Sequence, residues 1–391
     1  MHTSTGKLTA LLLALAMLLT LAACSGGSDT PAAPEAASPA PAADETPNTP
    51  PAEDETPATR TVTDALGRQV EVPAVVERIV PLGNAARLGT YLGLQDKFVT
   101  ISQGDLNETP YMAYGWYNRE AWSALPLAAT GGYGEFHPEV ILEADPDLIL
   151  CTFEPDIVAN IEEQTGLPVV AVAQGTLFGA DYDEALRILG EACGVSERAE
   201  AVVSFIHACL DDLDARTKDI PAADKPLLLG AAATFRGGHG ISGVYVDFPV
   251  FRAIAANDAA AGLEKESFDT GVEVDREQIL LWDPAVIFLD AGNLGLVSAE
   301  YGEDAAYFAQ LSAVQNGKLY QWPNSTANYT NLEIPLASAY YAGTILYPEA
   351  FADVDFEAKA EEIFQFFLGH AGYLQVLEEH SCGYGPVTLG V

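Results

Sequence analysis

A pattern that occurs twice, 138 residues apart, constrains the fold of this chain most strongly. Residues 137–150 and residues 275–288 share a glutamate, an Ile-Leu pair, an Asp-Pro step and a following apolar run at the same relative positions. Because proline disfavours helical backbone at the preceding residue, each copy predicts a short helix that stops at Asp-Pro and leads into a buried strand. We interpret the pair as two copies of one α/β unit; chance similarity is the alternative.

Apolar runs of strand length alternate with helical patterns along the chain. The predicted strands are residues 78–82, 98–102, 147–152, 168–173, 227–233, 286–290 and 318–322. Strands that alternate with helices are typical of parallel sheets. The fold class predicted is therefore α/β, with the strands divided into two sets.

One long helical pattern, over residues 196–218, lies between the two sets of strands. Ser196 can cap its N-terminus. Its apolar stripe consists of Val203, Ile206, Leu210 and Leu213, a spacing of three or four residues that indicates one buried helix face. We therefore predict an N-terminal lobe over residues 61–195, a connecting helix over 196–220 and a C-terminal lobe over 221–391.

The N-terminus has the pattern of a bacterial lipoprotein signal. Lys7 precedes an apolar run over residues 8–21, and Leu-Ala-Ala-Cys at residues 21–24 forms a cleavage site. The run is shorter than the roughly 20 residues of a membrane-spanning helix. We predict a signal peptide over residues 1–23 and lipidation of Cys24, which would anchor the protein to the extracytoplasmic face of the cell membrane. The alternative is an ordinary secretory signal with an incidental cysteine.

A low-complexity segment follows, over residues 24–60. It consists almost entirely of Ser, Gly, Ala, Pro, Thr, Asp and Glu and has no aromatic residue. Such a composition cannot bury enough apolar surface to offset the entropy of ordering. We expect a disordered tether between the anchor and the folded lobes.

Composition narrows the classes of partner and of chemistry. The formal net charge of −38 makes nucleic acid and anionic lipid poor partners. The cysteines are scattered, with no Cys-x-x-Cys pair, and Cys151 and Cys209 lie in apolar patterns typical of core residues. Their disulfide state stays open. The sequence contains no Gly-x-Ser-x-Gly, His-Glu-x-x-His or P-loop motif.

The start of the globular region resembles a known family. Residues 61–73 (TVTDALGRQVEVP), followed by Glu-Arg-Ile-Val at 77–80, are similar to the opening of the mature domain in class III ABC-transporter substrate-binding proteins. This family takes up iron–siderophore complexes, haem and cobalamin. The Tyr-Leu-Gly-Leu segment at 91–94, the duplicated unit and the single long helix are similar as well, so the resemblance covers residues 61–391.

The resemblance implies a fold and a set of partners. We expect two parallel-sheet α/β lobes joined by one rigid helix, with the ligand cleft between them at the carboxyl ends of the strands. The expected partners are a metal-complex small molecule, an ABC permease and its ATPase. We expect a monomer that is not an enzyme, needs no cofactor and contacts the membrane only through its lipid anchor.

The resemblance also assigns a role to one glutamate on each lobe. By motif position, Glu139 and Glu277 would dock on arginines of the permease, because exposed carboxylates pair well with guanidinium groups. The alternative is that each is an ordinary acidic residue in the first turn of a helix, where the helix dipole favours it.

Candidate ligand-binding residues lie mainly in the loops that follow the predicted strands. Arginine can pair with an anionic group, histidine can bind a metal or donate a hydrogen bond, and aromatic and amide groups suit a stacked, hydrogen-bonded ligand. The candidates are Asn84, Arg87, Tyr133, His137, Phe235, Arg236, His239, Trp322, Asn324 and Tyr329. As alternatives, the Gly-rich loop 234–240 could be a simple turn, the aromatics could be core residues, and His137 could belong to a helix start.

The ligand itself stays open at this stage, as do any metal-coordinating residues. We favour an iron complex, either a siderophore or haem. Molybdate, tungstate or cobalamin is the alternative within the same fold. Two other classes are a metal-dependent surface enzyme and a surface adhesion module; the second would not bind a permease.

Overall fold

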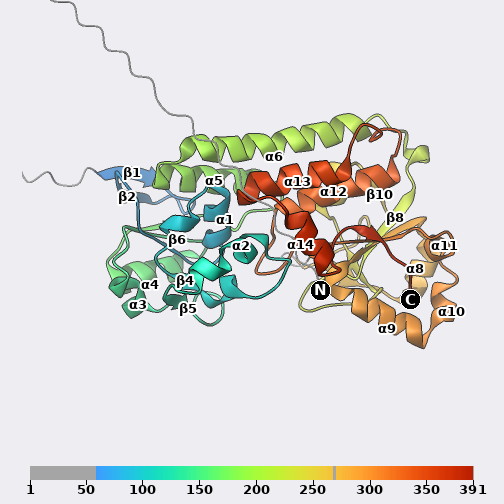
Figure 1. Cartoon of the computed structure of the whole chain (residues 1–391), viewed down its shortest axis with the longest axis horizontal. Coiled ribbons are helices and arrows are strands. Elements are labelled where there is room, and N and C mark those ends of the chain that lie inside the picture. Colours follow the sequence, from blue (N-terminus) through green and yellow to red (C-terminus); the bar gives the residue numbers. More distant parts are fainter. Residues whose placement is uncertain (1–58, 267–269, 391) are drawn as a thin grey trace, which may run out of the picture. The chain divides into compact units, whose positions relative to one another are not determined.

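The computed structural model describes residues 59–266 and 270–390 (Figure 1). The predicted signal peptide, Cys24 and the tether up to residue 58 lie outside the described residues. Within the described residues, no helix is both long enough and apolar enough to cross a membrane.

The N-terminal lobe is built on short parallel strands. After the hairpin of β1 (Thr59–Thr63) and β2 (Gln69–Pro73), the strands are β3 (Ile79–Pro81), β4 (Ile101–Ser102), β5 (Leu127–Ala129), β6 (Leu148–Cys151) and β7 (Val169–Ala171). β6 lies between β3 and β7, and β4 pairs with β5, all in parallel. Phe98 forms a single parallel bridge to Ile79, so the predicted strand 98–102 is regular only at its end.

Helices cover both faces of this sheet. They are α1 (Ala85–Tyr91), α2 (Ala113–Trp122), α3 (Pro138–Glu143), α4 (Pro155–Thr165) and α5 (Ala180–Cys193). Ile141 of α3 and Ile161 of α4 are buried in one apolar cluster with Ile149 of β6. The opposite face packs on α1 and α5 in a second cluster.

The C-terminal lobe has one larger, mixed sheet. Its strands are β8 (Leu227–Ala231), β9 (Gly243–Tyr245), β10 (Asn257–Asp258), β11 (Gly271–Glu273), β12 (Val286–Asp290), β13 (Leu319–Trp322) and β14 (Gly385–Pro386). The order is β11-β9-β8-β12-β13-β14, with β10 also pairing with β8. The centre, β8-β12-β13, is parallel as predicted. The antiparallel strands β9, β11 and β14 were not predicted, because two or three residues carry no periodic signal.

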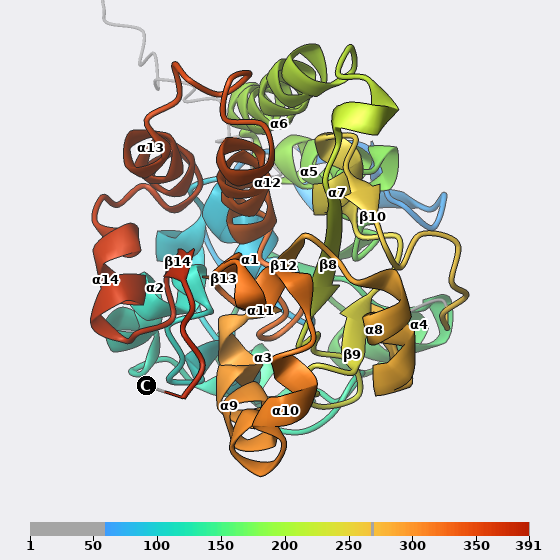
Figure 2. The same ribbon diagram turned by 90° about the vertical axis from the view of Figure 1, so that its right-hand side faces the viewer.

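The helices of this lobe fall into two groups (Figure 2). On one face of the sheet are α8 (Arg276–Trp282), α9 (Leu294–Glu303), α10 (Ala305–Phe308) and α11 (Ser312–Gln315); near α6 lie α7 (Pro249–Ala253), α12 (Glu333–Leu346) and α13 (Phe356–Leu368), with α14 (Tyr373–Glu379) beside α13. Ile279 of α8 is buried in the first face's own apolar cluster. Residues of α12, α13 and α14 share one buried cluster with α1, α5 and α6.

The long connecting helix is α6 (Ser196–Thr217), which runs along the top of Figure 1. Val203, Ile206 and Leu213 are buried, whereas Leu210 is half-buried. Val195, not Ser196, stands at the N-cap, and no side chain caps the helix; the predicted Ser196 cap is therefore wrong. Instead, α6 begins directly after the short connection from α5, which ends at Gly194 in a left-handed backbone conformation.

Arg198 and Arg216 fasten α6 to the C-terminal helices. Arg198 donates to the carbonyls of Tyr91 at 2.9 Å and Phe366 at 2.5 Å, which joins α6 to both α1 and α13. The connection between the lobes is therefore not α6 alone, since α13 also packs on α1.

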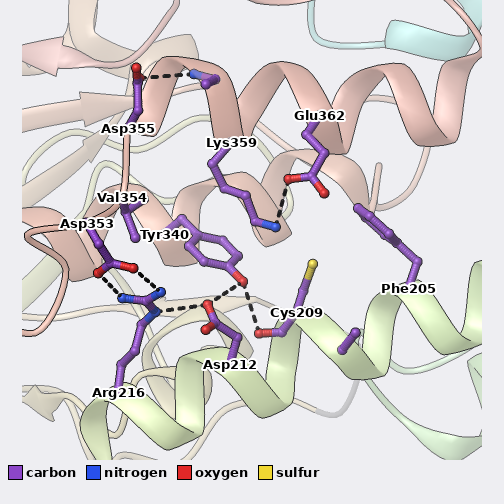
Figure 3. A pocket seen from close by; sticks show the side chains of 12 residues that line it. Phe205, Cys209, Asp212, Arg216, Tyr340, Asp353, Val354, Asp355, Lys359 and Glu362 are labelled. Carbon is purple, nitrogen blue, oxygen red and sulfur yellow. Dashed lines mark hydrogen bonds and ion pairs between the residues drawn. The ribbon is translucent and has the colours of Figure 1, made fainter.

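Figure 3 shows the contacts of Arg216, which lies in a cavity of about 500 Å³ between α6, α12 and α13. Arg216 pairs with Asp353 at 2.7 Å and with Asp212 at 2.9 Å, and the Tyr340 hydroxyl donates to Asp212 at 2.9 Å. The charged groups of this cavity thus pair with one another. We assign it a structural role, because these polar groups already satisfy each other.

The duplicated unit has the same local structure in both lobes. α3 precedes the central strand β6, and α8 precedes the central strand β12. Asp145 and Asp283, which precede the two prolines, have φ of 45° and 43°. Both helices therefore end in a left-handed residue before proline, which excludes helical continuation.

Candidate functional site

A cavity of about 1040 Å³ lies between the two lobes. Its walls come from loops that follow β3, β6 and β7 in one lobe and β8 and β13 in the other. These are the carboxyl ends of parallel strands, where open α/β sheets commonly bind ligands. The cavity is therefore the candidate ligand site.

Six of the predicted ligand-binding residues line this cavity. They are Asn84, Arg87, Tyr133, Phe235, Arg236 and Tyr329. Tyr133 is more than half exposed and packs edge-on against Phe153, with ring centroids 5.3 Å apart. Arg236 stands on the C-terminal side with φ of 49°, and it is exposed.

Arg87 is the most buried charged group of the cavity wall, with only 1% of its surface exposed. Its Nη1 donates to the Asn328 carbonyl at 2.8 Å, and its Nη2 donates to Asn84 Oδ1. Its buried Nε has no hydrogen-bond partner among the described residues. A buried guanidinium with spare donor capacity is suited to a negatively charged group.

The position of Asn328 is set by two residues of the N-terminal lobe. Its Nδ2 lies 2.8 Å from both Asp105 Oδ1 and the Tyr114 hydroxyl, and Tyr114 donates to the same carboxylate oxygen at 2.7 Å. Burial raises the pKa of Asp105 to about 6, although these hydrogen bonds oppose the shift. No motif singled out Asp105, because its role depends on a residue more than 200 positions away.

Threonine hydroxyls form a second set of polar groups around the cavity, and sequence reasoning missed them. They are Thr152, Thr176, Thr234, Thr270, Thr326 and Thr330. Glu154 and Asp181 also line the wall, but Asp181 is engaged by the backbone N–H of Thr176 at 2.8 Å. Four of the six hydroxyls already donate their single hydrogen to protein acceptors, since those of Thr176, Thr234, Thr270 and Thr326 donate to Asp181, Asp290, the Thr234 carbonyl and Asn324. The groups of the wall best suited to an anionic ligand are therefore the two guanidinium groups.

Trp322 and Asn324 do not line the cavity, contrary to expectation. Trp322 is buried and stacks on Phe288, with ring centroids 4.9 Å apart. It lies at the end of β13 on the face that packs into the core, so its strand position was predicted but its direction was not. Asn324 is also buried and donates to Asp290 Oδ2 at 2.6 Å.

Asn324 instead anchors its loop to the buried carboxylate of Asp290. Asp290 is fully buried and also accepts from Tyr245 at 3.0 Å and Thr234 at 3.2 Å. Burial raises the pKa of Asp290 to about 6. The loop over residues 323–331 is therefore held by Asp290 at one end and by Asp105 at the other.

The two histidine candidates also lie outside the main cavity. His239 stacks on Phe235, with ring centroids 3.9 Å apart, and its Nε2 lies 2.9 Å from the Phe235 carbonyl; it lines an adjoining cavity of about 480 Å³. His137 is the N-cap residue of α3, and its Nε2 lies 3.0 Å from Thr130 Oγ1. Local hydrogen bonds hold both rings away from the main cavity.

Glu139 and Glu277 occupy equivalent places in the two lobes. Each lies in the first turn of its helix, α3 or α8, and each is exposed. Neither makes an ion pair with another described residue. Their side chains are therefore accessible to a partner, and also placed where the helix dipole favours an acid.

The described residues hold no group of three or more His, Cys, Asp or Glu side chains that could bind a metal ion. Cys151, Cys193, Cys209 and Cys382 are all buried and unpaired with one another. Cys151 and Cys209 are core residues, as their apolar context predicted.

Two α/β lobes, one long connecting helix and a cavity at the carboxyl ends of the strands define a class III substrate-binding protein of an ABC transporter. Comparison with known proteins agrees: residues 108–326 match the family model described as periplasmic binding protein. The chain belongs to this family. The predicted family and fold class are thereby confirmed.

Individual relatives are more distant. The molybdate-binding protein MolA of Haemophilus influenzae is 24% identical over an alignment of 330 positions, which covers 79% of this chain and 90% of MolA. The structure of MolA bound to molybdate aligns with a TM-score of 0.60 at 19% identity, over 80% of this chain and 99% of that one. A periplasmic solute binding protein from Veillonella parvula aligns with a TM-score of 0.64 at 18% identity, over 83% and 98% of the two chains. At these identities the solved structures establish the fold alone.

Proposed function

We propose that this substrate-binding protein captures an anionic iron complex, either a siderophore chelate or haem, and delivers it to the permease of an ABC importer. The observation that carries the proposal is that two arginines, Arg87 from one lobe and Arg236 from the other, line the same cavity of about 1040 Å³. Siderophore chelates and haem carry carboxylate or other anionic oxygen groups, which guanidinium groups recognise. The cavity has the volume of sites that hold ligands of drug size or larger.

A tetrahedral oxyanion, molybdate or tungstate, is the second candidate ligand. The relation to the molybdate-binding protein favours it, and the guanidinium groups of Arg87 and Arg236 could donate to oxyanion oxygens. The volume argues against it, because a small anion would leave most of the cavity to water. Cobalamin fits less well than either, since it would call for an apolar cleft with few charges.

The partners and the location follow from the same proposal. Glu139 and Glu277 would dock on the permease, and Cys24 would carry the lipid anchor on the extracytoplasmic face. The protein would act as a monomer with no cofactor and no enzymatic activity, in keeping with relatives that are binding proteins rather than enzymes.

A thermal-shift panel on the purified protein tests the ligand. Ferric siderophores, haemin, cobalamin, molybdate and tungstate are each added at increasing concentration. A ligand at 100 times its dissociation constant stabilises the fold by about 2.7 kcal/mol. Stabilisation by a ferric chelate or haemin supports the proposal, whereas stabilisation by an oxyanion alone would replace the ligand and keep the transport role.

A further inference from the structure

Five large apolar side chains are exposed in the described part of the chain. They are Val75, Tyr133, Leu142, Leu281 and Leu296. Tyr133 lines the ligand cavity, and Leu296 lies beside Gly238 of the neighbouring loop. Leu142 and Leu281 are different, because they lie on the two duplicated helices that carry Glu139 and Glu277.

Each of these leucines shares a helix face with the docking glutamate. Leu142 follows Glu139 by three residues on α3, and Leu281 follows Glu277 by four residues on α8. Residues three or four apart are neighbours on a helix surface. Both lobes therefore present an acidic group beside an apolar one.

The orientation of each helix is set by its inward isoleucine. Ile141 and Ile279 occupy equivalent positions of the repeat, and both are fully buried in the clusters of their lobes. With those residues inside, Leu142 is left 47% exposed and Leu281 79% exposed. Each lobe therefore exposes a large apolar side chain one turn after its docking glutamate. The two leucines are not equivalent positions of the repeat, because at the offset of 138 residues Leu142 corresponds to Leu280. Exposed apolar side chains of this kind are typical of an interaction surface.

Figures 1 and 2 show α3 and α8 on different lobes, both below α6. The surface is thus divided into two patches, one on each lobe: Glu139 with Leu142, and Glu277 with Leu281. A partner that contacts both patches would span the ligand cavity between the lobes.

We propose that Leu142 and Leu281 are apolar contacts in the permease interface, each seated beside a basic residue that meets the adjacent glutamate. This rests on the proposed docking role of Glu139 and Glu277. The charge of the chain identifies the partner: at −38, a second copy or an anionic lipid surface would be repelled, whereas a basic extracytoplasmic face would be attracted. The glutamates would steer and orient the complex, and the leucines would slow its dissociation.

The test is binding of purified variants to the permease–ATPase complex in lipid nanodiscs. Leu142→Ser and Leu281→Ser should each weaken binding about tenfold, and the double variant about a hundredfold, because the apolar area buried on docking is lost. The loss should be the same at low and high salt. Val75→Ser is the matched control, since Val75 is 68% exposed but lies after β2, on neither α3 nor α8; it should bind as the unaltered protein does.

The outcomes distinguish the proposed leucine contacts from the proposed docking role of Glu139 and Glu277. Glu139→Gln with Glu277→Gln should weaken binding most at low salt, where exposed charges are least screened. If the glutamate variants bind weakly and the leucine variants bind normally, the leucine contact is refuted and the docking glutamates stand. If both sets bind normally, the docking face itself is refuted. Thermal melting of each variant checks that the fold is intact.

Discussion

Asn328 of the C-terminal lobe donates to Asp105 of the N-terminal lobe over 2.8 Å. The same residue accepts a hydrogen bond from Arg87 through its backbone carbonyl. The Arg87 guanidinium, which lies in the cavity wall, is therefore positioned by the opposite lobe. The arrangement links the geometry of the binding site to the contact between lobes.

Asn328→Ala should weaken both the fold and the site. It removes the donor to Asp105 and Tyr114, and it places alanine at a backbone φ of 47°, a left-handed conformation that asparagine tolerates better. We expect the free energy of unfolding to fall by about 1.5–3 kcal/mol, the contribution of a hydrogen bond to a charged group. Chemical denaturation measures this.

The control for that experiment is Asn316→Ala. Asn316 is exposed, and its side chain donates to the Ser312 carbonyl at 2.9 Å within a single turn. A similar loss in both variants would show that Asn328 has no special role between the lobes.

Asp105→Asn should change how stability depends on pH. Burial raises the pKa of Asp105 from 3.8 to about 6, so the folded state holds a proton that the unfolded state loses between these values. The stability of the unaltered protein therefore falls as pH rises through this window. The asparagine variant keeps an oxygen acceptor for Tyr114 and Asn328 and should gain about 2 kcal/mol relative to the unaltered protein between pH 4 and pH 7.

Asp353→Asn is the comparison, because the pKa of Asp353 is lowered in the folded protein, whereas that of Asp105 is raised. Pairing with Arg216 lowers the pKa of Asp353 to about 2, so its contribution is lost only as pH falls towards that value. Its stability profile should run parallel to that of the unaltered protein above pH 5. Parallel profiles for Asp105→Asn as well would contradict the assignment of a raised pKa to Asp105.

Arg236→Ala should weaken the binding of an anionic ligand. The loss of one charge-assisted hydrogen bond corresponds to about 1.5–3 kcal/mol. Calorimetry with the ligand identified in the thermal-shift panel measures the dissociation constant. Arg252→Ala is the control, because Arg252 is an exposed arginine of the same lobe that pairs with Asp247 outside the cavity. An unchanged constant for Arg236→Ala would remove this residue from the site.

Glu139→Ala combined with Glu277→Ala should abolish uptake in cells and leave ligand affinity unchanged. The reason is that both carboxylates are exposed on helices outside the cavity wall. Glu143→Ala, which removes an exposed acid from the end of α3, should transport normally. Reduced ligand affinity in the double variant would instead place these residues in the site.

Arg216→Met should loosen the attachment of α6 to the C-terminal helices. Arg216 bridges Asp212 and Asp353 and also donates to the Ala350 carbonyl at 2.9 Å. Because the network is partly solvent-exposed, we expect a loss of only about 1 kcal/mol in unfolding free energy. Arg187→Met, which removes a single exposed pair with Glu200, should cost less, and an equal cost would refute the fastening role.

Local sequence determined the parallel centre of each sheet and the long helix between the lobes. The apolar stripe of α6 and the Asp-Pro steps before β6 and β12 can be recognised from residues that are close in sequence. This is possible because helical periodicity and the effect of proline on the backbone extend over only one or two turns. The same locality explains why residues of the loops after β3 and β8, which line the cavity, could be singled out from the sequence.

Only the tertiary structure decided which side chains reach the cavity. Trp322 ends a correctly predicted strand, yet its ring points into the core, and the direction of a side chain depends on what the sheet packs against. Asp105 and Asn328 meet across the two lobes, over a separation of 223 residues. Such a pairing leaves no trace in local composition, because the hydrogen bond forms only after both lobes have folded.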